Sequence, residues 1–253
     1  MNGENKLKGR VIWLTGASSG IGFALATKLA DLDSELIISG RNEVRLNSLA
    51  RGRNNVHIHA FDITDRDQWL AVTKNIFTEF KFIDTVILNA GTCEYVDLPD
   101  FDVDLFRRVF DCNVMGCVYG IEASLPFLRQ SNDPHLVIMG SSIADLALAR
   151  AEAYGSSKAA IKYLIESLRL SLIPENIPVS GIYPGFIKTE LTDKNDFPMP
   201  LLMSADQAAE KIFLGLVNKK DEIYFPQMFT YLLKIIGCLP LPIRKYISRR
   251  FTT

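Results

Sequence analysis

The chain has 253 residues, 48% of them hydrophobic, and its 28 basic and 29 acidic residues leave a formal net charge of −1. This composition can build a large core and excludes an extensively disordered protein, and the balanced charge gives no reason to expect a nucleic-acid partner. The four cysteines have no CxxC spacing, so we expect reduced thiols and no metal site.

No segment predicts a membrane span. The first eight residues are polar and lack the apolar stretch of a secretory signal. Elsewhere no uninterrupted apolar run reaches the roughly 20 residues that a bilayer requires. We therefore expect a cytoplasmic protein.

Short apolar runs alternate with longer segments of helical periodicity. The runs expected to be strands are 11–14, 36–38, 56–61, 85–88, 136–139, 179–183 and 222–225. The helical segments are 21–32, 44–49, 69–80, 103–128, 151–172 and 205–217, the last capped by Ser204. Strands that are apolar throughout, each followed by a helix, are typical of a parallel sheet buried on both faces. We predict an α/β fold: one Rossmann-type, doubly wound domain over residues 1–253, with about seven strands and helices on both faces.

A glycine-rich turn at residues 15–22 joins the first strand to the first helix. Glycine lets the backbone approach a pyrophosphate closely, and the helix N-terminus offers free N–H groups. In this position of an α/β chain, such a turn favours dinucleotide binding over a purely geometric role. The residues expected to contact the cofactor are Gly16, Ser18, Ser19, Gly20, Ile21 and Gly22.

The end of the second strand indicates which dinucleotide binds. NAD sites usually place an acidic residue there, whereas this sequence reads Ser39-Gly40-Arg41. The guanidinium of Arg41 can pair with a 2′-phosphate, which predicts NADP(H), with NADPH bound more tightly than NADH. The alternative is a solvated arginine that opens the next helix. After the third strand, Asp62 and the adjacent Ile63 are expected at the adenine, unless Asp62 has only a turn or capping role.

Tyr154 and Lys158 are four residues apart in a predicted helix and share one face. The ordinary tyrosine pKa, about 10, is too high for efficient proton exchange at neutral pH. A nearby ammonium and an oxidised nicotinamide ring both lower that pKa. The spacing alone is common, but a Tyr-Gly-Ser-Ser-Lys run that opens a helix after the fifth strand is much more specific.

Two further polar residues are candidates for the same site. Ser141 follows the fifth strand and is expected to hydrogen-bond a substrate oxygen, with Ser142 as the alternative. Asn113 lies within the long helical segment, where asparagine is a poor helix former. Its presence there predicts an interior kink that holds a water.

Taken together, these motifs resemble the short-chain dehydrogenase/reductase family. The similarity covers about residues 8–225 and rests on four features in order: residues 15–22, Asn89-Ala90-Gly91, Ser141 with Tyr154 and Lys158, and Pro184-Gly185 with Thr189. Two departures, Leu88 where asparagine is common and Ala144 where glycine is common, do not touch the chemistry.

The resemblance implies a role for each matching residue. Tyr154 would be the catalytic acid/base, Ser141 would orient the carbonyl, and Lys158 would bind the nicotinamide ribose and lower the tyrosine pKa. Asn113 would hold a water in a proton relay. The residues expected to line the cofactor further along the chain are Asn89, Ala90, Gly91, Pro184, Gly185, Ile187 and Thr189.

The function predicted is interconversion of a carbonyl compound and its alcohol by NADP(H)-dependent hydride transfer. Apolar residues expected around the site favour an apolar or lipid-like substrate, although several could merely pack their loops: Leu146, Leu148, Phe186, Leu191, Phe197, Met199 and Leu202. The alternatives are a non-catalytic dinucleotide-binding regulatory protein and an NAD-preferring alcohol dehydrogenase. By resemblance, the protein would form a homodimer or homotetramer.

Residues 227–253 form a basic, apolar C-terminal extension beyond the common pattern. They contain no acidic residue, and apolar residues surround five basic ones: Lys234, Arg244, Lys245, Arg249 and Arg250. Such a segment can lie on an anionic membrane surface. It can also pack on a partner subunit or over the substrate cleft, and packing is the interpretation that we favour.

Overall fold

The computed structural model describes residues 6–249. A seven-stranded sheet has the order β3-β2-β1-β4-β5-β6-β9, and its paired neighbours are all parallel. The strands are β1 Val11–Thr15, β2 Glu35–Gly40, β3 Val56–Ala60, β4 Thr85–Leu88, β5 His135–Met139, β6 Val179–Pro184 and β9 Glu222–Phe225. The chain leaves β3 at one edge and resumes at β4 beside β1, so the strand order reverses between β1 and β4. The predicted doubly wound fold is confirmed.

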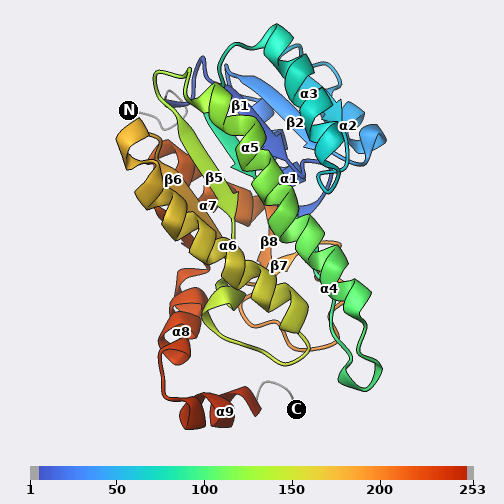
Figure 1. Ribbon diagram of the computed structural model, residues 1–253, viewed down its shortest axis with the longest axis vertical. Helices are drawn as coiled ribbons and strands as arrows, with labels where there is room; N and C mark the ends of the chain where they lie inside the picture. The colour runs from blue at the N-terminus through green and yellow to red at the C-terminus, as the bar shows by residue number, and fades with distance from the viewer. Residues whose placement is uncertain (1–5, 250–253) are drawn as a thin grey trace.

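Helices cover both faces of this sheet (Figure 1). They are α1 Gly20–Ala30, α2 Glu43–Ala50, α3 Arg66–Glu79, α4 Val103–Phe110, α5 Gly116–Leu128, α6 Glu152–Ser171 and α7 Ala205–Val217. Alternate residues of β1 divide the core, because successive side chains point to opposite faces. Ile12 and Leu14 pack with α1, α2 and α7, whereas Val11 and Trp13 pack with α3, α5 and α6.

The long helical segment predicted at 103–128 is interrupted. A π-helical turn, Asp111–Met115, separates α4 from α5 and contains the buried Asn113. The expected kink is thus a local widening of the helix, a feature frequent at functional sites.

The sequence pattern missed several elements beyond β6. Ile187–Lys188 (β7) and Met203–Ser204 (β8) form a small parallel sheet, and Gln227–Gly237 (α8) and Leu241–Arg249 (α9) follow β9. Ser204 caps α7 as predicted, in a reciprocal pair with Gln207. Across residues 6–249, no helix is both long and apolar enough to cross a membrane. All four cysteines are free thiols.

Candidate active site

The glycine turn after β1 depends on the absence of side chains. Gly16 and Gly20 have φ angles of +69° and +52°, in the left-handed region that favours glycine. A Cβ at Gly16 would lie 2.7 Å from the Cα of Ala90, and one at Gly22 would lie 2.1 Å from the Gly16 carbonyl oxygen. The turn therefore packs closely against both α1 and the segment after β4.

The N-terminus of α1 differs from those of α2, α3, α4 and α7. Side chains of Asn42, Asp65, Asp102 and Ser204 accept hydrogen bonds from the first turns of α2, α3, α4 and α7. In the described chain, the N-cap residue of α1, Ser19, makes no such bond. Backbone N–H groups at the start of α1 thus remain available to an anion. This geometry fits a dinucleotide pyrophosphate, which the glycine turn, Ser18 and Ser19 would hold.

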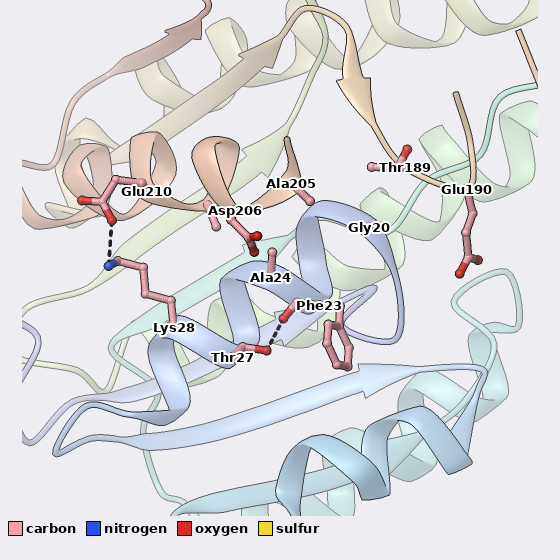
Figure 2. A pocket seen from close by; sticks show the side chains of 11 residues that line it. Gly20, Phe23, Ala24, Thr27, Lys28, Thr189, Glu190, Ala205, Asp206 and Glu210 are labelled. Carbon is pink, nitrogen blue, oxygen red and sulfur yellow. Dashed lines mark hydrogen bonds and ion pairs between the residues drawn. The ribbon is translucent and has the colours of Figure 1, made fainter. Parts of the chain in front are cut away.

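Gly20 and Thr189 meet at the mouth of a groove between α1 and α7 (Figure 2). A Cβ at Gly20 would lie 3.1 Å from the Thr189 methyl group. The groove has a volume of about 590 Å³, and the Lys28–Glu210 ion pair (2.7 Å) lies along it. Its lining residues are Gly20, Phe23, Ala24, Thr27, Lys28, Thr189, Glu190, Ala205, Asp206, Ala209 and Glu210. Ile21, beside Gly20, packs partly against the core.

Arg41 and Asp62 lie together at the carboxyl ends of β2 and β3. Their side chains approach to 4.0 Å, and the Arg41 side chain is 79% exposed. Asp62 Oδ1 accepts hydrogen bonds from the backbone N–H and hydroxyl of Thr64, while Asp65 caps α3. The capping role considered for Asp62 thus belongs to Asp65, whereas Asp62 does have the turn role that was the other alternative to adenine binding. Ile63 is buried, and its carbonyl accepts a hydrogen bond from Trp69 (2.8 Å).

Arg45 is a feature of the nucleotide end that the sequence analysis missed. Its guanidinium donates to the Ser18 carbonyl (3.4 Å) and pairs with Glu190 (2.5 Å). Arg45 therefore connects the glycine turn to the segment that follows β7. A helical arginine on α2 gives no sequence signal for contacts with such distant segments.

The segment after β4 is pinned to β1. The Asn89 side-chain amide donates to the carbonyls of Thr15 (3.0 Å) and Gly16 (3.3 Å), and the backbone N–H groups of Asn89 and Ala90 donate to the Thr15 hydroxyl. A Cβ at Gly91 would lie 3.0 Å from Asn113 Oδ1 and 3.5 Å from Lys158 Nζ. The predicted cofactor and catalytic residues therefore converge here.

Asn113, in the π-helical turn, hydrogen-bonds to the segment after β4 and to α6. Its Oδ1 accepts from the Thr92 N–H (2.8 Å), and its Nδ2 donates to the Thr92 carbonyl and to the Ser157 hydroxyl (both 2.9 Å). These hydrogen bonds fix the segment after β4 against α6. The expected water at Asn113 stays a prediction.

Ser141 and Ser142 have different partners. The Ser142 hydroxyl is buried and donates to the Pro184 carbonyl (2.9 Å), so its proton is engaged. Ser141 Oγ accepts from the Ile143 N–H (3.3 Å), so its own proton points to the side of Tyr154, with which it also forms a hydrogen bond. This difference favours Ser141 as the residue that binds a substrate oxygen.

Tyr154 lies half-buried in the first turns of α6. Burial raises its pKa, the adjacent Cys93 raises it further, and the hydrogen bond with Ser141 lowers it. Lys158 Nζ lies 6.0 Å from the Tyr154 ring centroid and donates to the Met139 carbonyl (3.0 Å); burial lowers the pKa of Lys158. The lowering of the tyrosine pKa that we expected from Lys158 therefore stays a prediction for the cofactor-loaded site.

Residues after β6 complete this edge of the sheet. Gly185 N–H donates to the Phe225 carbonyl (2.8 Å), and a Cβ there would lie 2.8 Å from the Phe229 ring. Ile187 is buried in β7, and the Thr189 N–H donates to the Thr192 hydroxyl (3.0 Å).

Ser141 and Tyr154 open onto a cavity of about 450 Å³. Of the apolar residues expected around the site, the lining includes Leu146, Leu148, Phe186, Leu191 and Phe197. Met199 and Leu202 are not part of it, since the Met199 sulfur accepts from Asn195 and Leu202 is exposed. Lining residues that the sequence analysis did not assign to the site include Cys93, Tyr95, Arg150, Asn195, Phe229 and Leu233.

A set of contacts closes one side of this cavity. Arg150, at a φ of +66°, pairs with Asp196 (2.9 Å), and its guanidinium lies 5.6 Å from the Tyr95 ring centroid. The Tyr95 hydroxyl donates to Asn195 (2.7 Å), and its ring packs edge-on against Phe197. These contacts hold the segment after β7 over the cavity.

The fold and these residues define a dinucleotide-binding α/β protein with a tyrosine, serine and lysine beside an apolar cavity. A family model described as short chain dehydrogenase matches residues 10–198. The chain belongs to the short-chain dehydrogenase family. It is therefore an oxidoreductase of the class that acts on CH–OH groups with NAD(P).

Curated relatives agree with this assignment. An uncharacterized oxidoreductase of Myxococcus xanthus is 32% identical over 245 residues, covering 95% of this chain and 97% of the relative. Another uncharacterized oxidoreductase, from Staphylococcus epidermidis, is 30% identical over 214 residues, covering 84% of this chain and 93% of the relative. The 11-beta-hydroxysteroid dehydrogenase 1A of Arabidopsis thaliana is 32% identical, covering 92% of this chain and 73% of the relative.

Proposed function

We propose that this protein is an NADP(H)-dependent oxidoreductase that interconverts an apolar carbonyl compound and its alcohol. The observation that carries the proposal is the position of Ser141 and Tyr154 on the wall of a cavity otherwise lined largely by aliphatic and aromatic side chains. A polar pair in an apolar cavity orients one oxygen and leaves the rest of the ligand in hydrophobic contact. The name of the Arabidopsis relative is in keeping with a large apolar substrate.

The chemistry divides between the cofactor and this chain. When bound, NADPH would supply the hydride that reduces the carbonyl carbon. The Tyr154 hydroxyl donates its proton to the carbonyl oxygen, which becomes the alcohol, and it takes that proton back in the reverse direction. Ser141, beside Tyr154, donates a hydrogen bond to the same oxygen and stabilises the charge that develops there.

Lys158 and Asn113 act around this pair. The Lys158 ammonium would bind the nicotinamide ribose and lower the pKa of Tyr154 when the site is loaded. Asn113 holds Thr92 and Ser157 in place through its side-chain amide. We propose that its remaining acceptor capacity holds a water that passes protons between solvent and Lys158.

The two directions of the reaction need different protonation states of Tyr154, so their rates should depend differently on pH. Because burial raises its pKa, the hydroxyl is protonated at neutral pH, the form that carbonyl reduction requires. Alcohol oxidation requires the phenolate, so kcat/KM should rise by about tenfold per pH unit below the pKa of the loaded site. Initial rates in both directions from about pH 6 to about pH 9 measure this. An oxidation profile that does not rise would contradict the assignment of Tyr154.

The contacts of Arg150 predict an effect on substrate binding. Replacing Arg150 by alanine removes the ion pair with Asp196 and should raise KM for an apolar substrate by up to about fivefold, since exposed pairs contribute little. The value of kcat should change less. Arg129→Ala, which breaks another exposed pair, with Glu175, is the matched control. An unchanged KM in Arg150→Ala would show that the cavity closes without this contact.

Turnover tests the proposed function directly. Purified protein with NADPH should reduce apolar ketones and aldehydes of increasing size, with kcat/KM rising with apolar area, and should reduce small hydrophilic ones poorly. Binding of NADPH without reduction of any carbonyl compound would favour the non-catalytic alternative. Preference for NADH would favour the NAD-dependent alternative.

Domain organisation, oligomeric state and location stay predictions. We propose a single domain over residues 1–253 and a cytoplasmic homodimer or homotetramer. Exposed apolar side chains on α5 and α6, including Val118, Tyr163 and Leu170, support association through these helices. Light scattering after gel filtration measures the mass of the assembly.

A further inference from the structure

Helix α8 has two apolar faces. One side faces the protein, where Phe229, Leu233 and Ile236 pack with Leu146 and Leu148. Phe229 and Leu233 also line the cavity. This side accounts for the docking of α8 beside the active site.

The other side of α8 carries an exposed apolar stripe. Its four residues follow the spacing i, i+3, i+4 and i+7, which places them in one row along the helix: Met228, Tyr231, Leu232 and Ile235. Their exposed fractions run from 49% to 79%. Apolar side chains gathered in this way on a surface mark a site of interaction.

Helix α9 carries exposed apolar side chains of its own. Leu241, Ile243 and Tyr246 are exposed large apolar residues on it. Figure 1 shows α8 and α9 at the end of the molecule that lies farthest from α2 and α3, with α9 turned across the end of α8. The two helices thus present apolar side chains at one pole of the protein.

All charged residues in the C-terminal segment are basic. Residues 227–253 contain five basic residues and no acidic residue. Lys234 pairs with Glu222 (3.4 Å), and Lys245 is exposed on α9 between the apolar residues. An apolar stripe flanked by basic side chains complements an anionic lipid surface, with the apolar residues at the acyl boundary and the cations among the headgroups.

We propose that α8 and α9 attach the protein to an anionic lipid surface and lie in its plane. An 11-residue helix is about 16 Å long, roughly half of the hydrocarbon thickness, so α8 cannot span it. A second copy of the chain fits less well, because a twofold interface would set one basic extension against another. The proposal goes beyond the reaction and does not depend on it.

Flotation of the full-length protein with vesicles tests the proposal. Vesicles of phosphatidylcholine with about one third phosphatidylserine should carry the protein, and phosphatidylcholine alone should carry much less. Raising salt from about 0.1 M to about 1 M should release it, because the screening length falls from about 10 Å to about 3 Å. Equal flotation with both vesicle types, or with neither, would overturn the proposal.

Matched variants assign the contact to this surface. Leu232→Gln should lower the bound-to-free ratio by roughly tenfold, whereas Leu70→Gln, at 52% exposure against 50%, should leave it unchanged. Lys245→Gln should lower the ratio by about fivefold and Lys81→Gln should not. Circular dichroism checks that each variant is folded.

Two results would contradict this assignment. If Leu232→Gln and Lys245→Gln both floated as well as the wild type, the lipid contact would lie elsewhere. The stripe would instead bind a second copy of the chain if three results came together. The wild type would not float, light scattering would give it twice the mass of one chain, and Leu232→Gln would have the mass of one chain. Flotation requires no turnover, so its failure is distinguishable from a failure of the proposed reaction.

Discussion

Replacing Tyr154 by phenylalanine should lower kcat/KM for carbonyl reduction by roughly 10²- to 10⁴-fold, the usual contribution of a positioned acid or base. The change removes one oxygen and keeps the ring on the cavity wall. The Ser141 hydroxyl would still polarise the carbonyl, so some turnover should remain. The carbonyl oxygen would then lack the proton that Tyr154 donates in the wild type.

The measurement is the rate of NADPH consumption with an apolar ketone, together with the affinity for NADPH from its fluorescence. NADPH should bind the variant about as tightly as the wild type, so the loss should fall on the chemical step. Tyr163→Phe, which removes the hydroxyl of an exposed tyrosine on the same helix, is the control. Equal activity of Tyr154→Phe and the wild type would refute the proposed mechanism.

Replacing Arg41 by alanine should weaken NADPH binding by roughly ten- to a hundredfold, since a hydrogen bond to a charged group contributes about 1.5–3 kcal/mol. The affinity for NADH should hardly change, because NADH lacks the 2′-phosphate that Arg41 would bind. The wild-type preference for NADPH should also shrink at high salt, as screening weakens this exposed pair.

Titration of each nucleotide into wild type and variant measures the effect. Arg107→Ala is the matched control, with 78% of its side chain exposed against 79% for Arg41. Equal affinities of the wild type for NADPH and NADH would remove the basis for the prediction. If Arg41→Ala still preferred NADPH, another group would determine the selectivity. Arg45, the next arginine along the chain, would be the first candidate.

The alternating apolar runs were sufficient to predict the central sheet. Strands β1, β4, β5 and β6 are buried on both faces, so their apolar composition alone indicates them, and only the edge strand β3 of Val56–Ala60 is largely half-exposed among the first six strands of the sheet. The same signal is weaker at β7 and β8, which have two residues each and lie outside the main sheet. Helix α8 was not predicted because it carries apolar residues toward the protein and toward the surface, so no single apolar face marks it as a helix that packs on the core. Its partners, Leu146 and Leu148, also lie far away in the sequence.

The site was predictable where residue types cluster along the chain. The glycine turn and the pair Tyr154 and Lys158 are local patterns, and the structure brings them to one edge of the sheet. Cys93, Tyr95 and Arg150 reach the cavity from loops, where spacing carries no periodic signal. The choice of Ser141 over Ser142 required their hydrogen-bond partners, which no pattern of residues records.

The π-helical turn at Asp111–Met115 makes the site sensitive to single-residue deletions. Removing one residue there would restore a regular helix, because a π-helical turn holds one residue more than an α-helical turn. Helix α5 would keep its face toward the sheet, with Gly120 still packed against Leu88 and Trp69. The hydrogen bonds of Asn113 to Thr92 and Ser157 start from the widened turn and would be displaced. A deletion within residues 111–115 should therefore impair the site and leave the fold intact.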